Sequence, residues 1–247
     1  NILEPSCGVG SFFGCLPESM SASRLYGVEL DGISGRIAKQ LYPKANITVA
    51  GFETTSRNDF YDAAVGNVPF GDYGVSDPSY DKYHFSIHNY FLCKTLDQLR
   101  PGGVMAVVTS RFTMDSKDST ARRYLAERAD LLGAIRLPNN AFKANAGTDV
   151  VSDILFLQKL DEPNLALPDW VSTTENQDGY PVNCYFNDYP EMVLGCPGVK
   201  STRYGHDYTV YPSPGADLAQ QLHDAVSRIR GTYRKAVSTE PDDESAG

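Results

Sequence analysis

The amino-acid sequence predicts an α/β protein: a doubly wound, mostly parallel sheet followed by an irregular C-terminal extension. Two observations support this prediction. Over residues 1–160, short apolar runs typical of buried strands alternate with longer amphipathic segments typical of helices. After Leu160, prolines recur too often for regular elements of any length. We therefore expect one domain over residues 1–160 and an extension over residues 161–247.

The alternation can be followed element by element. Apolar runs predict strands at Ile2–Leu3, Leu25–Leu30, Ile47–Ala50, Ala63–Val65, Val104–Val108, Leu131–Leu137 and Val151–Leu157. Helical periodicity predicts helices over Ile33–Tyr42, Tyr83–Leu99 and Thr120–Ala129. Ile37, Ala38 and Leu41 should face the core, and Pro101-Gly102-Gly103 should stop the second helix. The first five strands are expected in the spatial order 3-2-1-4-5, with an antiparallel last pair joined by the polar residues 139–148.

The extension is expected to hold only short regular pieces. Extended segments are predicted around Cys184–Phe186 and Tyr208–Val210. Ser213-Pro214 should cap a helix. Its apolar stripe would consist of Leu218, Leu222, Ala225, Val226, Ile229 and Tyr233. The acidic end from Glu240 to Gly247 is expected to be disordered.

Composition limits the class of protein. With 247 residues and 41% hydrophobic content, the chain can bury one good core and a smaller appendage. Five cysteines without C-x-x-C spacing favour a reduced, cytoplasmic chain with no disulfide framework and no zinc site. No long apolar run predicts a membrane span. Because the chain begins with Asn1 directly on the first predicted strand, we expect an N-terminally truncated domain.

The charge is unusual for a protein that binds nucleic acid. The net charge is −9, of which residues 161–247 contribute −8 and residues 1–160 only −1. Phosphate binding favours a basic surface. Basic residues at or beyond the later strands could form a local basic face, or could be scattered solvated charges. They are Arg111, Lys117, Arg122, Arg123, Arg128, Arg136 and Lys143.

A glycine-containing loop follows the first strand. In Glu4-Pro5-Ser6-Cys7-Gly8-Val9-Gly10, the two glycines let the backbone pass close to a ligand. The next glycine is Gly14, one residue later than a dinucleotide-binding G-x-G-x-x-G pattern requires, which weakens that interpretation. Glu29 ends the second strand, 21 residues after Gly8, where a carboxylate can accept hydrogen bonds from both hydroxyls of a ribose. Together these features predict a nucleoside site.

A second polar turn follows the fourth strand, in Asp62-Ala63-Ala64-Val65-Gly66-Asn67-Val68-Pro69-Phe70. The amide oxygen of Asn67 and the carbonyl of Val68 can accept both hydrogens of an exocyclic amine, and Phe70 offers a face for stacking. This combination suits a flipped-out nucleobase. The alternative is an ordinary strand-to-loop turn with Phe70 in the core.

The motifs Glu4–Gly10, Tyr26–Asp31 and Asn67–Phe70, in this order, resemble those of S-adenosylmethionine-dependent DNA methyltransferases that modify the N6 of adenine. The resemblance extends through Leu132–Pro138 and Val151–Leu157, which are similar to late strands of type I restriction-modification methylase subunits, and so covers roughly residues 1–160. Val68 stands where the family usually has proline. We interpret it as a variant resembling large methylase-helicase proteins of phages and mobile elements.

The resemblance implies a Rossmann-like sheet of the S-adenosylmethionine-dependent methyltransferase type and assigns roles to residues. Cofactor-binding residues would be Glu4, Pro5, Ser6, Gly8, Gly10, Phe12, Glu29, Phe52 and Glu53. The loop would hold the methionine portion, Glu29 the ribose, and Phe52 and Glu53 the adenine. Phe52 as a core ring and Glu53 as a solvated carboxylate are the alternatives. Catalytic residues would be Asn67, Val68, Pro69 and Phe70.

The resemblance further implies an adenine-specific DNA methyltransferase with DNA as its partner, together with further domains of a larger polypeptide or a specificity or helicase partner. Two alternatives remain. The chain could be a cofactor-binding but inactive interaction module of a larger phage or mobile-element protein. It could also methylate a protein glutamine, because similar Asn-Pro-Pro-aromatic sites accept an amide.

Three weaker candidates complete the analysis. His84 and His88 would lie one turn apart on a helix, a spacing that metal sites use, but no general-base glutamate lies between them and we predict no metal. Cys7 is expected to be a small packing residue and not a nucleophile. The polar segment Asp72–Lys82 could be a mobile loop that closes over the base, or a solvated connection.

Overall fold

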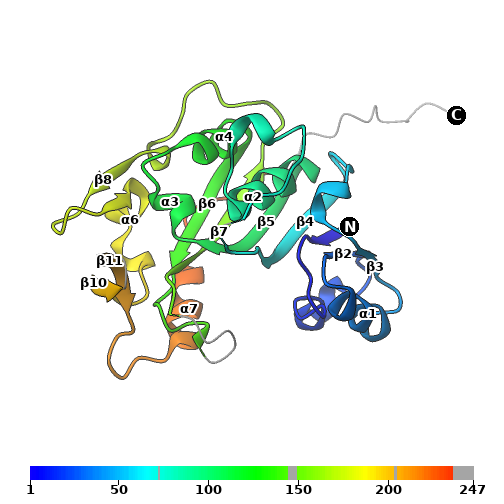
Figure 1. The fold of residues 1–247 in the computed structure, drawn as a ribbon, viewed down its shortest axis with the longest axis horizontal. Helices are drawn as coiled ribbons and strands as arrows, with labels where there is room; N and C mark the ends of the chain where they lie inside the picture. Colours follow the sequence, from blue (N-terminus) through cyan, green and yellow to red (C-terminus); the bar gives the residue numbers. More distant parts are fainter. Residues whose placement is uncertain (72, 144–148, 203–204, 236–247) are drawn as a thin grey trace, which may run out of the picture.

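The computed structural model describes residues 1–71, 73–143, 149–202 and 205–235. Its centre is a seven-stranded sheet with the order β3-β2-β1-β4-β5-β7-β6 (Figure 1). The strands are β1 Ile2–Glu4, β2 Leu25–Glu29, β3 Asn46–Val49, β4 Tyr61–Asn67, β5 Leu99–Ser110, β6 Ala129–Arg136 and β7 Ser152–Lys159. Neighbours from β3 to β5 are parallel, whereas β7 is antiparallel to both β5 and β6. The predicted order 3-2-1-4-5 and the antiparallel last pair are confirmed.

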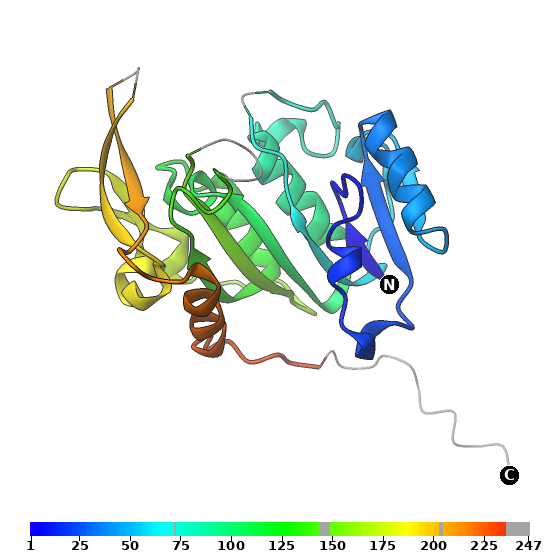
Figure 2. The same ribbon diagram turned by 90° about the horizontal axis from the view of Figure 1, so that it is seen from below.

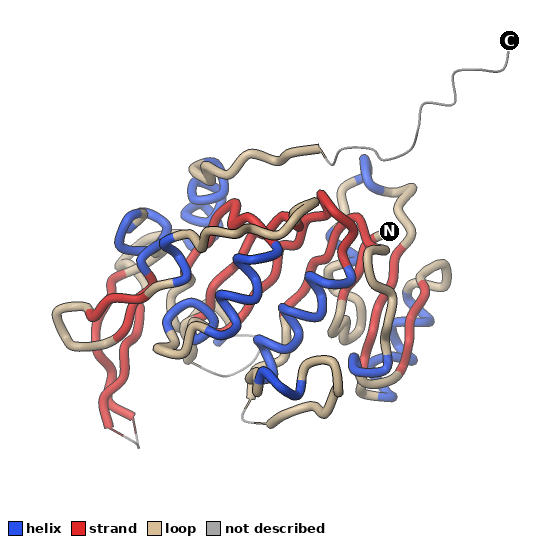
Figure 3. The backbone as a smooth tube through the Cα atoms, turned by 90° about the horizontal axis from the view of Figure 1, so that it is seen from above, coloured by secondary structure: helices blue, strands red, loops and turns tan. Residues whose placement is uncertain are grey.

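Helices lie on the faces of this sheet. Helix α1 (Gly32–Leu41) packs against β2 and β3. Helices α2 (Ile87–Gln98) and α4 (Thr120–Arg128) run side by side across one face, and α7 (Leu218–Ser227) lies against β6 on the opposite face (Figure 3). A short helix, α3 (Phe112–Asp115), follows β5 directly. Crossover connections on both faces bring the carboxyl ends of β1 and β4 together as neighbours, which is where ligands bind in doubly wound sheets.

The buried face of α1 differs from the prediction. Ala38 is fully buried, but Ile37 and Leu41 are 43% and 58% exposed. The reason is close packing through small residues: a Cβ atom on Gly35 would lie 2.7 Å from Val49 Cγ2. The helix therefore approaches β3 on its Gly35 and Ala38 side, and the larger apolar residues lie away from the sheet.

Helix α2 is shorter than predicted at its start. His84 ends a 3-10 turn over Asp81–Tyr83 and has left-handed backbone angles, with φ 52° and ψ 39°. A right-handed helix cannot continue through such a residue, so α2 begins only at Ile87. His84 and His88 therefore do not share a helix, and the spacing on which a metal site would depend is absent. The helix also ends at Gln98, and Pro101-Gly102-Gly103 lies within β5.

The extension contains more regular structure than expected. Its elements are β8 (Thr173–Glu175), β9 (Pro181–Asn183), α6 (Cys184–Asp188), β10 (Cys196–Thr202) and β11 (Gly205–Tyr211). The prediction of an extended segment at Cys184–Phe186 is wrong, because Asn183 caps a helical turn there by accepting a hydrogen bond from the Tyr185 amide at 2.9 Å. Tyr208–Val210 is extended, as predicted, within the antiparallel hairpin β10–β11.

The C-terminal helix also starts later than predicted. Asp217, and not Ser213-Pro214, caps α7 by accepting a hydrogen bond from the Ala219 amide at 3.0 Å. Ala225 is buried, while Val226 is 48% exposed and Tyr233 lies beyond the helix. The predicted disordered end, Glu240–Gly247, falls outside the described residues. Buried extension residues such as Trp170, Phe186 and Tyr208 belong to the same hydrophobic cluster as the sheet.

Candidate functional site

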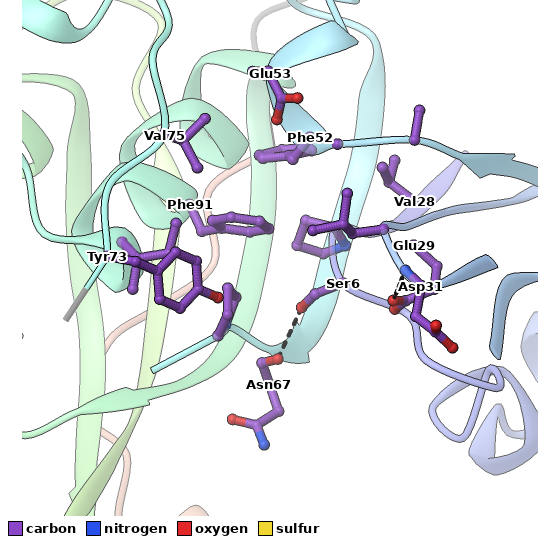
Figure 4. Close-up of a pocket in the computed structure, with 16 residues that line it drawn as sticks. Ser6, Val28, Glu29, Asp31, Phe52, Glu53, Asn67, Tyr73, Val75 and Phe91 are labelled. Atoms are coloured by element: carbon purple, nitrogen blue, oxygen red, sulfur yellow. Dashed lines mark hydrogen bonds between the residues drawn. The ribbon is translucent and has the colours of Figure 1, made fainter. Parts of the chain in front are cut away.

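Two cavities lie side by side at the carboxyl edge of β1, β2 and β4. The first has a volume of about 590 Å³, and Figure 4 draws its lining. It is lined by Pro5, Ser6, Val28, Glu29, Leu30, Asp31, Ala50, Gly51, Phe52, Glu53, Asn67, Pro69, Tyr73, Val75, Ile87 and Phe91. The second has about 560 Å³ and is lined by Glu4, Ser6, Cys7, Gly8, Val9, Ser11, Phe12, Asn67, Phe70, Val108, Phe142 and Val150. Both cavities include Ser6 and Asn67, so these two residues mark their junction.

Glu29 organises the loop after β1. Its Oε2 accepts a hydrogen bond from the Gly8 amide at 2.7 Å, and its Oε1 accepts one from the Asp31 amide at 2.7 Å. Gly8 has φ 53°, a left-handed conformation that glycine adopts without strain. No atom lies within 4 Å of the position where a Cβ of residue 8 would sit. The loop backbone is therefore held by Glu29 and is open toward the second cavity.

Gly10 is required for a steric reason. With φ 86°, it lies so close to the end of α1 that a Cβ atom would be 2.6 Å from Tyr42 Cε2.

Cys7 in the same loop is buried, and burial raises the pKa of its thiol to about 12. A thiol with such a pKa remains protonated at neutral pH, so Cys7 is not an activated nucleophile. This agrees with its predicted role in packing.

Glu4 is the most unusual ionisable group at the site. Its side chain is 2% exposed, and its Oε2 has no hydrogen-bond partner within the described structure. Burial, and secondarily the negative charge of Glu29, raises the pKa of the Glu4 carboxyl from 4.5 to about 8. Glu4 lines the second cavity beside Gly8. A buried carboxyl that lacks a counter-charge is suited to receive a cationic group of a ligand.

The shift in Glu4 predicts how stability depends on pH. The unfolded chain releases the proton of this carboxyl near pH 4.5, whereas the folded chain retains it to about pH 8. Stability without ligand should therefore fall as the pH rises between these values, by on the order of 2 to 4 kcal/mol for this group. Glu4→Gln should remove that part of the pH dependence in urea unfolding measured at several pH values. The exposed Glu18→Gln is the control, and an unchanged pH profile in Glu4→Gln would contradict the assignment.

The loop after β4 is fixed to both neighbouring strands. Ser6 Oγ donates to the Asn67 carbonyl at 2.8 Å, and the Val68 amide donates to the Val108 carbonyl at 3.1 Å. The Asn67 side chain is exposed and points away from the rings of the first cavity (Figure 4). Pro69 lines the first cavity and Phe70 the second, while the Val68 side chain is buried in the core. Valine instead of proline at residue 68 supplies an N–H that proline lacks.

Phe52 belongs both to the core and to the first cavity. It is 2% exposed and stacks on Phe91, with ring centroids 4.8 Å apart and an interplanar angle of 25°. The position of Phe52 is therefore compatible both with a contact to the adenine of the cofactor and with a role as a core ring. Glu53 is exposed at the margin of the same cavity.

The structure adds residues that sequence reasoning missed. Tyr73, Val75, Ile87 and Phe91 complete the first cavity. Phe142 and Val150, from the connection between β6 and β7, line the second cavity together with Phe12. Ile87 and Phe91 lie four residues apart on α2, and this spacing indicates that they share one face of the helix. It did not distinguish a cavity-lining position from a core position. No sequence pattern distinguished Phe142.

The segment between the Asn67 loop and α2 is anchored by one buried carboxylate. Asp77 Oδ2 accepts hydrogen bonds from Tyr90 Oη and Lys94 Nζ, each at 2.8 Å. Tyr80 from the same segment is buried against Tyr90, with ring centroids 5.4 Å apart. Asp77 and Tyr80 therefore pack this segment against α2, while most of its other described residues are exposed; Asp72 itself lies outside the described residues.

The hypothesis of a basic face fails for three of its members. Arg111, Arg122 and Arg136 are 5%, 1% and 0% exposed. Arg111 and Arg136 both pair with the buried carboxylate of Asp115, and Arg122 donates to backbone carbonyls. These three guanidinium groups bond to neighbouring elements inside the protein, so their charges are not available at the surface for binding phosphate. Lys117 and Lys143 form surface ion pairs with Glu175 and Asp149.

Two proteins are similar to this chain in sequence. The defence against restriction protein B of Escherichia phage P1 is 34% identical over 166 residues, which are 64% of this chain and 7% of that protein. The type II methyltransferase M.CvrRI of Paramecium bursaria Chlorella virus XZ-6E is 29% identical over 164 residues, covering 64% of this chain and 42% of that protein. The chain thus spans less than half the length of both relatives. No family model matches the chain. Within the part of the chain that the structure describes, no helix is long and apolar enough to cross a membrane.

Solved structures share the fold. A modification subunit of a putative type I restriction enzyme from Vibrio vulnificus YJ016 superposes with a TM-score of 0.53 at 16% identity, covering 85% of this chain and 54% of that one. A putative class I S-adenosylmethionine-dependent methyltransferase from Listeria monocytogenes superposes with a TM-score of 0.54 at 18% identity, covering 67% of this chain and 56% of that one. The resemblance inferred from the motifs is confirmed: the chain has the Rossmann-like fold of S-adenosylmethionine-dependent methyltransferases and is similar in sequence to a type II methyltransferase and to a phage defence protein.

Proposed function

We propose that the chain is a methyltransferase that binds S-adenosylmethionine in the first cavity and methylates the N6 amine of an adenine in DNA held in the second. The junction of the two cavities at Ser6 and Asn67 carries this proposal. A methyl donor on one side and an acceptor base on the other would meet there, which is the arrangement that direct transfer requires. Residues 1–160 are proposed as the catalytic domain and residues 161–247 as its extension.

The residues of the first cavity fit the proposed cofactor. Each Glu29 oxygen accepts one backbone N–H and retains a lone pair for a ribose hydroxyl. Phe52, Phe91 and Pro69 supply apolar walls for a planar purine. Glu4 lines the second cavity beside Gly8, so the methionine portion of the cofactor would extend past Ser6 into that cavity, where the unpartnered Glu4 oxygen suits the positive charge of the ammonium group. The bound cofactor would supply a methyl group on a positively charged sulfur.

The residues of the second cavity fit a base. Asn67 Oδ1 and the Val68 carbonyl would accept the two hydrogens of the N6 amine and favour a pyramidal nitrogen with its lone pair directed at the methyl carbon. Phe70 and Phe142 line the remaining space with rings on which an extruded base can stack, while Phe12 stays assigned to the cofactor. As the N–C bond forms and the S–C bond breaks, the nitrogen releases one proton. No strong general base is needed, because positioning and fixed dipoles lower the barrier.

The sequence relatives support DNA as the acceptor, and the share of their length that this chain spans bears on where the DNA sequence is recognised. The sequence relatives are a type II methyltransferase and a phage protein named for defence against restriction. The chain spans 42% and 7% of these proteins. We therefore propose that sequence recognition resides outside this chain, in further domains or in a specificity or helicase partner.

The proposal is tested by incubating the protein with isotopically labelled S-adenosylmethionine and unmethylated DNA, followed by mass spectrometry of the nucleosides. We expect N6-methyladenine. Label in another nucleoside would contradict the adenine assignment. Cofactor binding without transfer to DNA would favour the interaction module, and label on glutamine in added protein would favour an amide acceptor.

Glu29→Ala should weaken the binding of S-adenosylmethionine by about 1.5 to 3 kcal/mol, the range for the loss of charge-assisted hydrogen bonds. Part of the loss would come from Gly8, whose amide loses its partner at 2.7 Å. Isothermal calorimetry measures the change. Glu18→Ala, at an exposed position away from both cavities, should bind as the wild type does, and equal affinity of Glu29→Ala and wild type would refute the cofactor site.

A further inference from the structure

The hairpin β10–β11 contacts the connection between β6 and β7, which contributes Phe142 and Val150 to the second cavity. Figures 1 and 2 show the hairpin beyond the β6 end of the sheet, away from α1 and β3. The described parts of this connection are residues 137–143 and 149–151. Both parts are bonded to the hairpin, although about 50 to 70 residues separate the partners along the chain.

The first contact is at Asn139, three residues before Phe142. Its backbone amide donates to the Val210 carbonyl at 2.8 Å, and its Nδ2 donates to Thr209 Oγ1 at 3.0 Å. Asn139 is 9% exposed, and Thr209 and Val210 are 0% exposed. Buried polar groups of this kind are costly to leave unpaired, so the two bonds hold Asn139 firmly to β11.

Residues 138–143 transmit this constraint to Phe142. The Ala141 amide donates to the Pro138 carbonyl at 3.0 Å, and the Lys143 amide donates to the Asn140 carbonyl at 3.0 Å. These two bonds fold the chain into consecutive tight turns, which link the position of Phe142 to that of Asn139. The Phe142 ring is partly buried against the core and faces the second cavity.

The second contact is at the other end of the connection. Lys200 Nζ donates to the Asp149 carbonyl at 2.8 Å, directly before Val150. Arg111 donates through Nη2 to Asp207 of β11 at 2.6 Å, and its own amide donates to the Val151 carbonyl at 3.4 Å. Arg111 follows β5, the strand that also bonds the Val68 amide. The hairpin is thereby bonded to the strand end that supports the Asn67 loop.

We propose that β10–β11 is a positioning element for the acceptor: Thr209 and Lys200 fix the two ends of the β6–β7 connection and so set the places of Phe142 and Val150 beside Asn67. The proposal rests on the proposed function for the identity of the acceptor. The contacts themselves do not depend on it. Among the described residues, no hydrogen bond or ion pair joins the hairpin to Glu29 or Phe52, so the hairpin should act on the acceptor and not on the cofactor.

Thr209→Val tests the inference, because valine has nearly the same shape and lacks the hydroxyl that accepts from Asn139. We expect amide hydrogen exchange in residues 138–143 to become at least about tenfold faster, with exchange in residues 1–35 unchanged. In methyl-transfer assays, the single-turnover rate on DNA should fall about tenfold while the dissociation constant of S-adenosylmethionine stays at its wild-type value. Thr209→Ser, which restores the hydroxyl, should recover both properties.

Two comparisons make the test specific. Ser201→Ala removes an exposed hydroxyl from the same hairpin and should leave exchange and transfer unchanged. The double variant Asn139→Ala with Thr209→Val should show the same exchange and transfer rates as Asn139→Ala alone. Each change removes the same hydrogen bond, the one between Asn139 Nδ2 and Thr209 Oγ1. Lys200→Ala perturbs the other end at a half-buried site and should raise exchange around Val150 without unfolding the chain.

Two results would overturn the inference: unchanged exchange in residues 138–143 in Thr209→Val, or a loss of cofactor affinity as large as the loss of transfer. Failure of the proposed function is distinguishable from both. If the wild-type protein transfers no methyl group to DNA, the adenine acceptor is refuted, and hydrogen exchange alone then decides whether the hairpin holds the connection.

Discussion

Asn67→Ala is expected to lower the single-turnover rate of methyl transfer to DNA by on the order of 10² or more, with the affinity for S-adenosylmethionine near wild type. The exposed amide of Asn67 points away from the rings of the first cavity and lines the second. Its loss removes an acceptor for the N6 amine and leaves Glu29, Phe52 and Phe91 in place. The backbone of the loop should also persist, since the Ser6 hydrogen bond reaches the Asn67 carbonyl and not the side chain.

The matched control is Asn58→Ala, at an exposed asparagine outside both cavities. It should have wild-type transfer and binding. Rapid-quench single-turnover kinetics give the transfer rate, and calorimetry gives the cofactor affinity. If Asn67→Ala methylates DNA at the wild-type rate, then Asn67–Phe70 is only a turn and the acceptor site lies elsewhere.

Arg136→Met is expected to reduce the free energy of unfolding by about 3 to 5 kcal/mol, the cost of breaking a buried ion pair by removing one partner. Arg136 is 0% exposed and donates to Asp153 through Nε at 2.8 Å and through Nη2 at 2.9 Å. Its Nη1 lies 2.8 Å from Asp115 Oδ2, an ion pair without hydrogen-bond geometry. Methionine would leave two buried carboxylates without this counter-charge.

Urea unfolding at neutral pH measures this change. Arg123→Met is the matched control: this arginine is exposed on α4 and bonds only Ser119 through its side chain among the contacts described, so its replacement should cost less than about 0.5 kcal/mol. A loss in Arg136→Met no larger than that of the control would mean that the pair contributes nothing to stability. The contrast tests burial directly, because the two variants remove the same side chain.

Much of the structure of residues 1–160 followed from local sequence patterns. The apolar runs before the Gly8 and Asn67 turns located β1 and β4, and the usual strand order of a doubly wound sheet predicted that these strands are neighbours, as they are. The interval between Gly8 and Glu29 predicted that they act together, and the structure joins them by a hydrogen bond of 2.7 Å. These features are predictable because each depends on a few consecutive residues and on a general rule of sheet topology.

Other features depend on contacts between distant residues. Ile37 and Leu41 have the periodicity of a buried stripe, yet close packing at Gly35 exposes them. His84 continues the helical pattern of α2 but adopts left-handed angles. Arg111 and Arg136 look like solvated cations in the sequence, and only Asp115, Asp153 and Asp207, brought together by folding, make their burial possible.

The sequence by itself determined the strands and the loops at the ends of β1 and β4, because periodicity and glycine conformation act locally, and the alternation of strands and helices then predicted the strand order of a doubly wound sheet. Only the tertiary structure decided which charges are buried and which residues enclose the second cavity. Phe142 reaches that cavity because Asn139 is bonded to Thr209 and Val210, about 70 residues further along the chain. The free energy of such a contact depends on the burial of both partners, and burial is a property of the assembled fold.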